Sequence, residues 1–156
     1  MSMAQSVKRY LETIGVEHQL LPHPQTQSSR ETATAAHIPP DHVAKAVILN
    51  SGADLLMAVI PGDSWVKLKI LQQELNRPLE LTPETVLDAY FKDCQPGAIP
   101  PLGPAYGLET VLDEAFTTLA TVYFEAGDHQ HLVQVSGEDF QRLLSGVRRG
   151  HFCHNG

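Results

Sequence analysis

The sequence predicts a mixed α/β domain, and three observations lead to this prediction. Segments with helical periodicity alternate along the chain with short runs rich in β-branched residues. Two of these runs, "KAVILN" and "LLMAVIP", are separated only by "SGAD", which is typical of a hairpin. No glycine-rich phosphate loop joins a strand to a helix, so a doubly wound nucleotide-binding fold is not favoured.

The first third of the chain contains clear start and stop signals. Apolar residues recur at helical spacing over 7–14, and Gly15 can end that helix. "VEHQLLP" alternates like a strand that ends at Pro22. "SSRETATAAHI" begins with good N-cap residues and predicts a short helix. Pro39 and Pro40 can open one further helical turn.

The rest of the chain continues the alternation. "SWVKLKILQQELN" is expected to begin extended and to become helical after Leu68. "LTPETVLDAYF" predicts a helix with Thr82 as N-cap and Pro83 in the first position. "ETVLDEAF", "LATVYFEAG" and "HLVQVSG" predict strands. "SGEDFQRLLSG" predicts a closing helix capped by Ser136 and ended by Gly146.

Length and composition indicate one domain. The chain has 156 residues, of which 42% are hydrophobic and 19% charged, which excludes a disordered class. We expect residues 1–146 to form a single domain and residues 147–156 to be a loose C-terminal tail with little to pack. The apolar runs are too short to cross a bilayer, and the N-terminus lacks a signal-peptide pattern, so we expect a cytoplasmic protein without a membrane partner.

Charge and cysteine content exclude several classes of function. The formal net charge of −7 argues against broad binding of DNA or other nucleic acid, although a few local cations can still bind one short end of a nucleic acid. Two cysteines are too few for a disulfide framework or a cysteine-based zinc site. Cys94 is either an ordinary reduced thiol or a nucleophile, and no Cys/His motif surrounds it.

Lys45 stands at the start of the apolar run "AKAVILN". A lysine in a buried strand costs desolvation unless its ammonium reaches a cleft or meets an anion. The spacing alone favours a lysine whose ammonium snorkels to solvent at the end of a strand, and it leaves a functional cation open.

A second candidate is "HQH", with His129 and His131 two positions apart. On a strand, both imidazoles would face one side and could bind one metal. No third ligand stands at a telling spacing, so we expect no metal site, while one histidine at a turn could still bind a substrate.

A third candidate is the uncharged loop within "DCQPGAIPPLGPAYG". Glycine lets a ligand approach the backbone closely, and proline fixes φ at low entropic cost, so the loop can form a rigid wall. It can equally be a connection that merely crosses the surface. The spacing G-x-x-x-P is formed by Gly97, Ala98, Ile99, Pro100 and Pro101.

The order of these features along the chain is more informative than any one of them alone. The order "HVAKAVIL … LLMAVIPGDSWVKLK … DCQPGAIPPLG … VYFEAGDHQHLVQVSGEDFQRLL" resembles the YbaK/prolyl-tRNA synthetase-associated domain family from about Thr26 to Leu144. The loop and the lysine-bearing strand most resemble its freestanding alanyl-tRNA(Pro) deacylases. The resemblance implies a curved, partly barrel-like mixed sheet surrounded by helices, no cofactor, and hydrolysis of a mischarged aminoacyl-tRNA. It also implies the tRNA acceptor end as a partner, with prolyl-tRNA synthetase as a second candidate partner.

The resemblance also assigns residues. Lys45 matches the functional lysine of the family, Gly97 and Pro101 match the ends of its G-x-x-x-P loop, and His129 matches a histidine of the substrate pocket. Ala98, Ile99 and Pro100 then belong to the substrate-binding loop. Arg30, Lys67 and Lys69 are candidates to contact the acceptor stem, provided that the acidic residues face elsewhere.

The same resemblance gives the loop a purpose. Prolyl-tRNA synthetase must bind proline, and its pocket can reject the smaller alanine by only about 1–3 kcal/mol of binding free energy. A second site that hydrolyses the mischarged product is therefore useful. The prolines of the loop could exclude larger residues while Gly97 admits the aminoacyl group. These prolines are Pro96, Pro100, Pro101 and Pro104.

Two alternatives remain open at this point. One is a noncatalytic module of the same fold that binds an aminoacyl end or a small ligand. The other is a metal-dependent hydrolase that uses "HQH".

Overall fold

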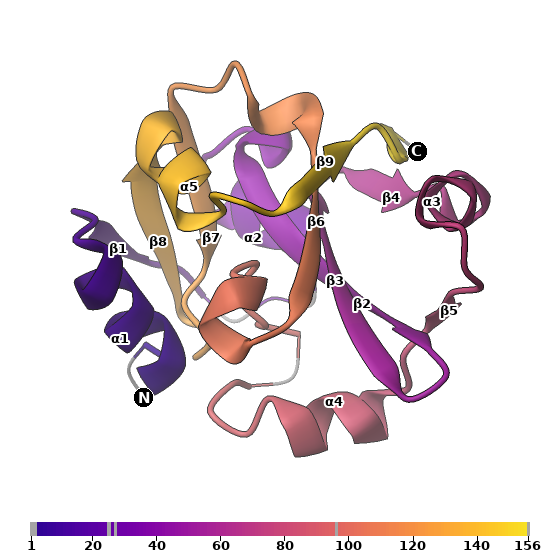
Figure 1. Ribbon diagram of the computed structural model, residues 1–156. Coiled ribbons are helices and arrows are strands. Elements are labelled where there is room, and N and C mark those ends of the chain that lie inside the picture. The colour runs from indigo at the N-terminus through magenta and orange to yellow at the C-terminus, as the bar shows by residue number, and fades with distance from the viewer. Residues whose placement is uncertain (1–2, 25, 27, 96, 156) are drawn as a thin grey trace.

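The structure is a computed structural model that describes residues 3–24, 26, 28–95 and 97–155 (Figure 1). Its centre is one large mixed β-sheet, as predicted. The order across the sheet is β1 (Gln19–Pro22), β8 (His131–Ser136), β7 (Thr121–Glu125), β2 (Val43–Ser51), β3 (Asp54–Pro61), β6 (Glu109–Asp113) and β9 (Arg148–Gly150). β5 (Glu80–Leu81) pairs with the far end of β2.

The sheet is mixed because it contains both parallel and antiparallel strand pairs. The β2–β3 hairpin is antiparallel, whereas β2 runs parallel to β7, and β3 runs parallel to β6. Across the described residues, no pairing joins the outer strands β1 and β9, so the sheet does not close into a barrel. The mixed α/β class is therefore confirmed, with an open sheet.

In the described part of the chain, five α-helices surround the sheet: α1 (Gln5–Ile14), α2 (Ser29–Ala35), α3 (Leu68–Leu75), α4 (Glu84–Tyr90) and α5 (Gly137–Leu143). All five occur where the sequence predicts them. Gly15 ends α1 with φ 80°, and the Ser136 hydroxyl caps α5 by accepting the Asp139 N–H at 3.0 Å. α4 begins one residue later than predicted, with Pro83 at the N-cap, because the Thr82 hydroxyl bonds Asn50 instead.

Among the described residues, short 3₁₀ helices form three of the connections: η1 (Pro40–His42), η2 (Gly103–Tyr106) and η3 (Glu114–Phe116). The last of these shortens a predicted strand, because the Asp113 carboxylate accepts the Ala115 N–H and turns "EAF" out of β6. No helix in the described part of the chain is long and apolar enough to span a membrane.

Apolar side chains pack on both faces of the sheet. One cluster joins α1 and α5 to β7 and β8, with Phe124 and Phe140 among its fully buried members. A second cluster lies under α3 and contains Leu71 and Phe152. Figure 1 shows α1 and α5 on one side of the molecule and α3 on the other, with α4 below.

The last residues of the chain differ from the prediction of a loose tail. β9 pairs in parallel with β6, and β10 (Cys153–Asn155) pairs with β4 (Ser64–Val66). Phe152, between them, is fully buried, and its N–H donates to Asp113 Oδ2 at 3.0 Å. One buried aromatic ring and two short strand pairings therefore order a segment that has little apolar sequence of its own.

Candidate functional site

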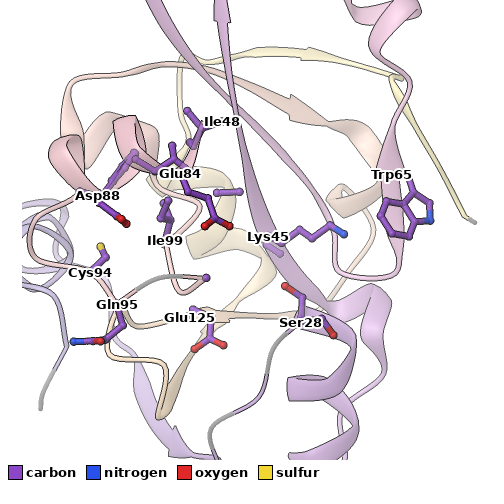
Figure 2. Close-up of a pocket in the computed structure, with 16 residues that line it drawn as sticks. Ser28, Lys45, Ile48, Trp65, Glu84, Asp88, Cys94, Gln95, Ile99 and Glu125 are labelled. Atoms are coloured by element: carbon purple, nitrogen blue, oxygen red, sulfur yellow. The ribbon is translucent and has the colours of Figure 1, made fainter. Parts of the chain in front are cut away.

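A cavity of about 360 Å³ lies beside β2. Its wall comes from β2, α4, the loop that follows α4, the first residues of α2, the end of β7 and Trp65 of β4. Figure 2 shows the side chains of Lys45, Glu84, Ile99 and Glu125 around this space, with Trp65 at its edge. The cavity brings together segments that are distant in the sequence.

Lys45 lies half-buried on β2, and its ammonium points toward Trp65 (Figure 2). Lys45 Nζ is 5.0 Å from the centre of the Trp65 ring. Burial lowers the pKa of Lys45, Asp63 opposes this shift, and Arg30 adds to it. Across the described residues, no carboxylate lies within 4.0 Å of this ammonium. Lys45 is therefore a partly desolvated cation at the cavity wall, without an ion-pair partner in that part of the chain.

The loop after α4 forms the opposite wall. The Ala98 N–H donates to the Gln95 carbonyl at 3.1 Å, and Gly97 has φ 80°, a conformation that glycine adopts without strain. Gly97 and Ile99 line the cavity. Ala98, Pro100 and Pro101 are buried behind them. Pro96 lies outside the described residues. The lining part of the G-x-x-x-P segment is thus Gly97 and Ile99, which the two prolines support from within.

Asp93 anchors this loop to the rest of the molecule. Its Oδ2 accepts the Ser6 N–H at 3.0 Å, which caps α1, and its Oδ1 accepts from the Tyr106 hydroxyl at 3.2 Å. Burial alone would raise the pKa of Asp93, but the hydrogen bonds from Ser6, Cys94 and Tyr106 hold it below its usual value. The carboxylate therefore stays ionised and fixes the base of the loop.

Cys94 also lines the cavity, but its thiol is unreactive. Burial raises the pKa of Cys94 to about 12, and its hydrogen bond from Tyr106 only partly opposes that shift. The thiolate is the nucleophilic form, and almost none of it exists near neutral pH. The structure thus favours the ordinary thiol over the nucleophile.

Glu125 at the end of β7 is the functional candidate that the sequence analysis missed. It lines the cavity, and its carboxylate lies 3.0 Å from His23 Nε2, 3.2 Å from His129 Nδ1 and 3.2 Å from Thr32 Oγ1. All four residues are buried. The available signal was a charged residue inside the apolar run "VYFEAG", the same kind of signal that identified Lys45.

The two histidines of "HQH" do not act as a pair. β8 begins at His131, whereas His129 lies in the preceding turn with φ 59°. His131 Nδ1 bonds Asp128 Oδ2 at 2.6 Å, and His129 bonds Glu125. The strand geometry that would align both imidazoles is absent at this turn. Ligand atoms of His23, Glu125 and His129 instead lie within 4.8 Å of one another and could hold a metal ion.

The candidate tRNA-binding cations lie in different places. Arg30 is exposed near Lys45, and its Nη2 is 3.4 Å from the Asp63 carbonyl oxygen. Lys67 and Lys69 are exposed at the start of α3, and Lys69 borders a separate shallow depression along that helix. The expectation that acidic residues face elsewhere is wrong for α4, because Glu84 and Asp88 both line the cavity.

Solved structures share this fold. The "hypothetical protein APE2540" aligns with a TM-score of 0.83 at 19% identity, over 96% of this chain and all of that one. A "putative trans-editing enzyme for prolyl tRNA synthetase" aligns with a TM-score of 0.82 at 19% identity, over 97% of this chain and 96% of that one. A "putative signal transduction protein" from Marinobacter aquaeolei VT8 aligns with a TM-score of 0.78 at 21% identity, over 95% of this chain and 30% of that one.

These identities establish the fold alone, and a search of curated proteins gave no significant match. Family membership comes from the sequence model of the aminoacyl-tRNA editing domain, which matches residues 23–143. That range contains β2 with Lys45, the loop after α4, and the turn that carries Glu125 and His129. The chain therefore belongs to the aminoacyl-tRNA editing domain family.

Proposed function

We propose that this protein is a trans-editing deacylase that hydrolyses the ester of mischarged tRNA(Pro), with alanyl-tRNA(Pro) as its main substrate. The observation that carries this proposal is the cavity of about 360 Å³, with Lys45 on one wall and the Gly97–Ile99 loop on the other. Membership in the editing-domain family supports the reaction class. The structural relative described as a "putative trans-editing enzyme for prolyl tRNA synthetase" supports the proline system, with that synthetase as a candidate partner.

An aminoacyl ester is already activated, so the enzyme needs to align it rather than to supply a strong nucleophile. Water attacks the carbonyl, assisted by the free hydroxyl of the terminal ribose, and the ester carbon–oxygen bond breaks. Lys45 stabilises the terminal phosphate or the negative charge that develops on the carbonyl oxygen. Its partly desolvated ammonium suits either role, because a cation interacts more strongly where water is excluded.

The loop supplies the size limit. Gly97 presents no side chain to the cavity, so the aminoacyl group can approach the backbone closely. Pro100 and Pro101 directly follow Ile99, and because both are buried and have a fixed φ, they restrain the backbone that carries Ile99. A wall of this kind admits an alanyl group and rejects the prolyl ring by steric clash.

Trp65 and Arg30 are suited to the nucleotide part of the substrate. Trp65 is 58% exposed although it is the largest aromatic residue at the cavity edge. Unstacked bases bind to such rings by stacking, and a nearby arginine can pair with phosphate. We therefore assign Trp65 to the terminal base and Arg30 to the backbone beside it.

A deacylation panel tests the proposal. tRNA(Pro) is charged in turn with alanine, cysteine, serine and proline, and release of each amino acid is measured with purified protein. We expect fast release of alanine and no release of proline above the spontaneous rate. Equal release of alanine and proline contradicts the size limit. Binding of the charged tRNA without any release would favour a noncatalytic binding module instead.

A further inference from the structure

Glu125 is a buried carboxylate at a cavity wall, and its partners leave part of it open to the cavity. Its side chain is 8% exposed, and three groups contact it: the His23 and His129 rings and the Thr32 hydroxyl. A carboxylate has about four acceptor positions. The three contacts therefore leave acceptor capacity on a residue that lines the cavity.

The His23 ring is one of the groups that hold this carboxylate in place. His23 Nδ1 lies 2.7 Å from the carbonyl oxygen of Pro24, which only accepts, so Nδ1 carries a hydrogen. His23 Nε2 lies 3.0 Å from Glu125 Oε1. The His23 ring therefore links the Pro24 backbone to Glu125 and fixes the direction of the carboxylate from one side.

The turn between β7 and β8 fixes the position of His129, the other histidine that contacts Glu125. The Asp128 carboxylate accepts the Gln130 and His131 N–H groups at 3.0 Å each. The Gly127 carbonyl accepts the Gln95 N–H at 2.7 Å and so ties this turn to the loop after α4. His129 is held with Nδ1 toward Glu125 and Nε2 toward Gly97, since a Cβ added at Gly97 would lie 3.8 Å from Nε2.

The cavity wall thus carries groups of both charges. The Lys45 end, formed by Lys45 and Trp65, presents a cation, and Arg30 lies nearby. Glu84 and Asp88 of α4 line another part of the wall. The Glu125 end, formed by Glu125 with His23, His129 and Thr32, presents a carboxylate acceptor. An aminoacyl-tRNA end offers groups of both charges as well, because its phosphates are anionic and its α-amino group is a cation when protonated.

We propose that Glu125 binds the α-ammonium group of the aminoacyl substrate, and that His129 and His23 are positioning residues that hold its carboxylate toward the cavity. The inference rests on the proposed function, because it assigns a subsite within the same reaction. The enzyme then requires a free α-ammonium on its substrate. This requirement is separate from the size limit set by the Gly97–Ile99 loop.

Lactyl-tRNA(Pro) tests the requirement, because lactate has the methyl group of alanine but a neutral hydroxyl in place of the ammonium. Each enzymatic rate is divided by the spontaneous hydrolysis rate of the same ester, which removes the intrinsic difference in reactivity. We expect alanyl-tRNA(Pro) to be favoured by about 10- to 100-fold, the loss typical of one charge-assisted hydrogen bond. Equal corrected rates overturn the proposal.

Glu125→Gln is the decisive variant. A glutamine amide can donate to an unprotonated His23 Nε2 and accept from His129 Nδ1, so the local hydrogen bonds survive without the charge. We expect the preference for alanyl over lactyl ester to fall close to one. Glu84→Gln is the matched control, since Glu84 lines the same cavity on α4, and its preference should stay at the wild-type value. A Glu125→Gln enzyme that is slower on both esters but keeps the preference overturns the proposal in favour of a structural role.

A binding measurement with the wild-type protein separates this inference from the proposed function. The probes are 3′-alanylamino-3′-deoxyadenosine and its lactyl counterpart, whose amides resist hydrolysis. We expect the alanyl compound to bind about 10- to 100-fold more tightly and to shift the NMR signal of the Glu125 carboxyl carbon. Such a preference supports the subsite even if the deacylation panel fails. Equal affinities, or no binding of either probe, overturn it.

Discussion

The two ends of the cavity are built in opposite ways. At the Lys45 end, a regular strand presents a half-buried cation beside an exposed ring, with Trp65 58% exposed. At the Glu125 end, the last residue of β7 presents a buried carboxylate, which His23, Thr32 and His129 of the following turn hold in place. An open cationic end suits a large, mobile tRNA terminus, whereas a closed, pre-organised end suits a small group whose position must be exact to the ångström. Variants at the two ends should therefore fail in different ways.

The largest effect is expected from Lys45→Ala. Loss of one electrostatic contact to a phosphate or a developing oxyanion lowers turnover by about 100-fold. Burial lowers the pKa of Lys45, so below that pKa the charged lysine destabilises the folded state. The free energy of unfolding of the alanine variant should therefore equal the wild-type value or exceed it slightly. Single-turnover deacylation of alanyl-tRNA(Pro), together with a melting curve, measures both quantities.

Two further variants sharpen this prediction. Lys45→Arg keeps the charge but replaces the compact ammonium with a planar group, so we expect poor rescue in a small cavity. Lys8→Ala is the matched control, since Lys8 is exposed on α1 and does not line the cavity. A well-folded Lys45→Ala protein with the wild-type rate would return Lys45 to the role of a snorkelling strand residue.

The next largest effect is expected from Trp65→Ala. Stacking of one base on an aromatic ring contributes about 1–3 kcal/mol, so KM for alanyl-tRNA(Pro) should rise by about 10-fold or more. The rate at saturating substrate should change less, because Trp65 contacts the nucleotide and not the ester. Trp65→Phe should recover part of the loss. Tyr90→Ala, which removes an exposed ring on α4 outside the cavity, should leave KM unchanged.

The comparison of the two ends also explains what the sequence predicts well. Lys45 stands out because a charged residue interrupts a strand whose boundaries follow from local propensity. The helices are predictable for the same reason, since Gly15 and Ser136 act within their own turns. Features that depend on residues close together in the chain can therefore be recognised from the sequence alone.

The Glu125 end depends on contacts that no local pattern encodes. His23, Thr32 and the Glu125–His129 stretch come from three separate segments, and only the sheet order brings β1 and α2 beside the β7–β8 turn. The prediction of a loose tail is wrong for the same reason, because Phe152 packs under α3 against residues that are distant in the sequence. In the sequence, "HQH" looks like two histidines on one strand. The hydrogen bonds of Asp128 and the positive φ of His129, which place His129 in a turn instead, appear only in the folded structure.

A smaller effect, on stability, is expected from Asp128→Asn at the Glu125 end. Burial alone would raise the pKa of Asp128, but hydrogen bonds from Gln130 and His131 hold it below its usual value. A lowered carboxyl pKa contributes stability above its unfolded value of about 3.9, and this contribution is lost as the pH falls through the folded pKa. The variant should lose about 1–2 kcal/mol of unfolding free energy at pH 7.

The pH dependence distinguishes this cause from a general weakening of the turn. Urea unfolding at pH 7 and near pH 3 should show the difference between wild type and Asp128→Asn shrinking in acid. Asp54→Asn is the control, because Asp54 is exposed in the β2–β3 hairpin and should change stability little at either pH. A difference that stays constant from pH 7 to pH 3 would contradict the charge-based explanation.

The smallest effect is expected from metal removal, and it tests the Glu125 end most directly. The ligand atoms of His23, Glu125 and His129 lie within 4.8 Å of one another, and a His₂Glu set is a known arrangement for catalytic zinc. Each of these atoms already has a hydrogen-bond partner within the cluster, so the carboxylate does not need a cation to be stable before substrate binds. An activated ester also does not demand a metal-bound water. The deacylation rate of alanyl-tRNA(Pro) should therefore change by less than about twofold after dialysis against EDTA. A twofold change in rate corresponds to less than about 0.5 kcal/mol of transition-state stabilisation. Loss of activity in EDTA with recovery on adding zinc would assign Glu125 to a metal, and the same ion would then occupy the position that we assign to the α-ammonium group.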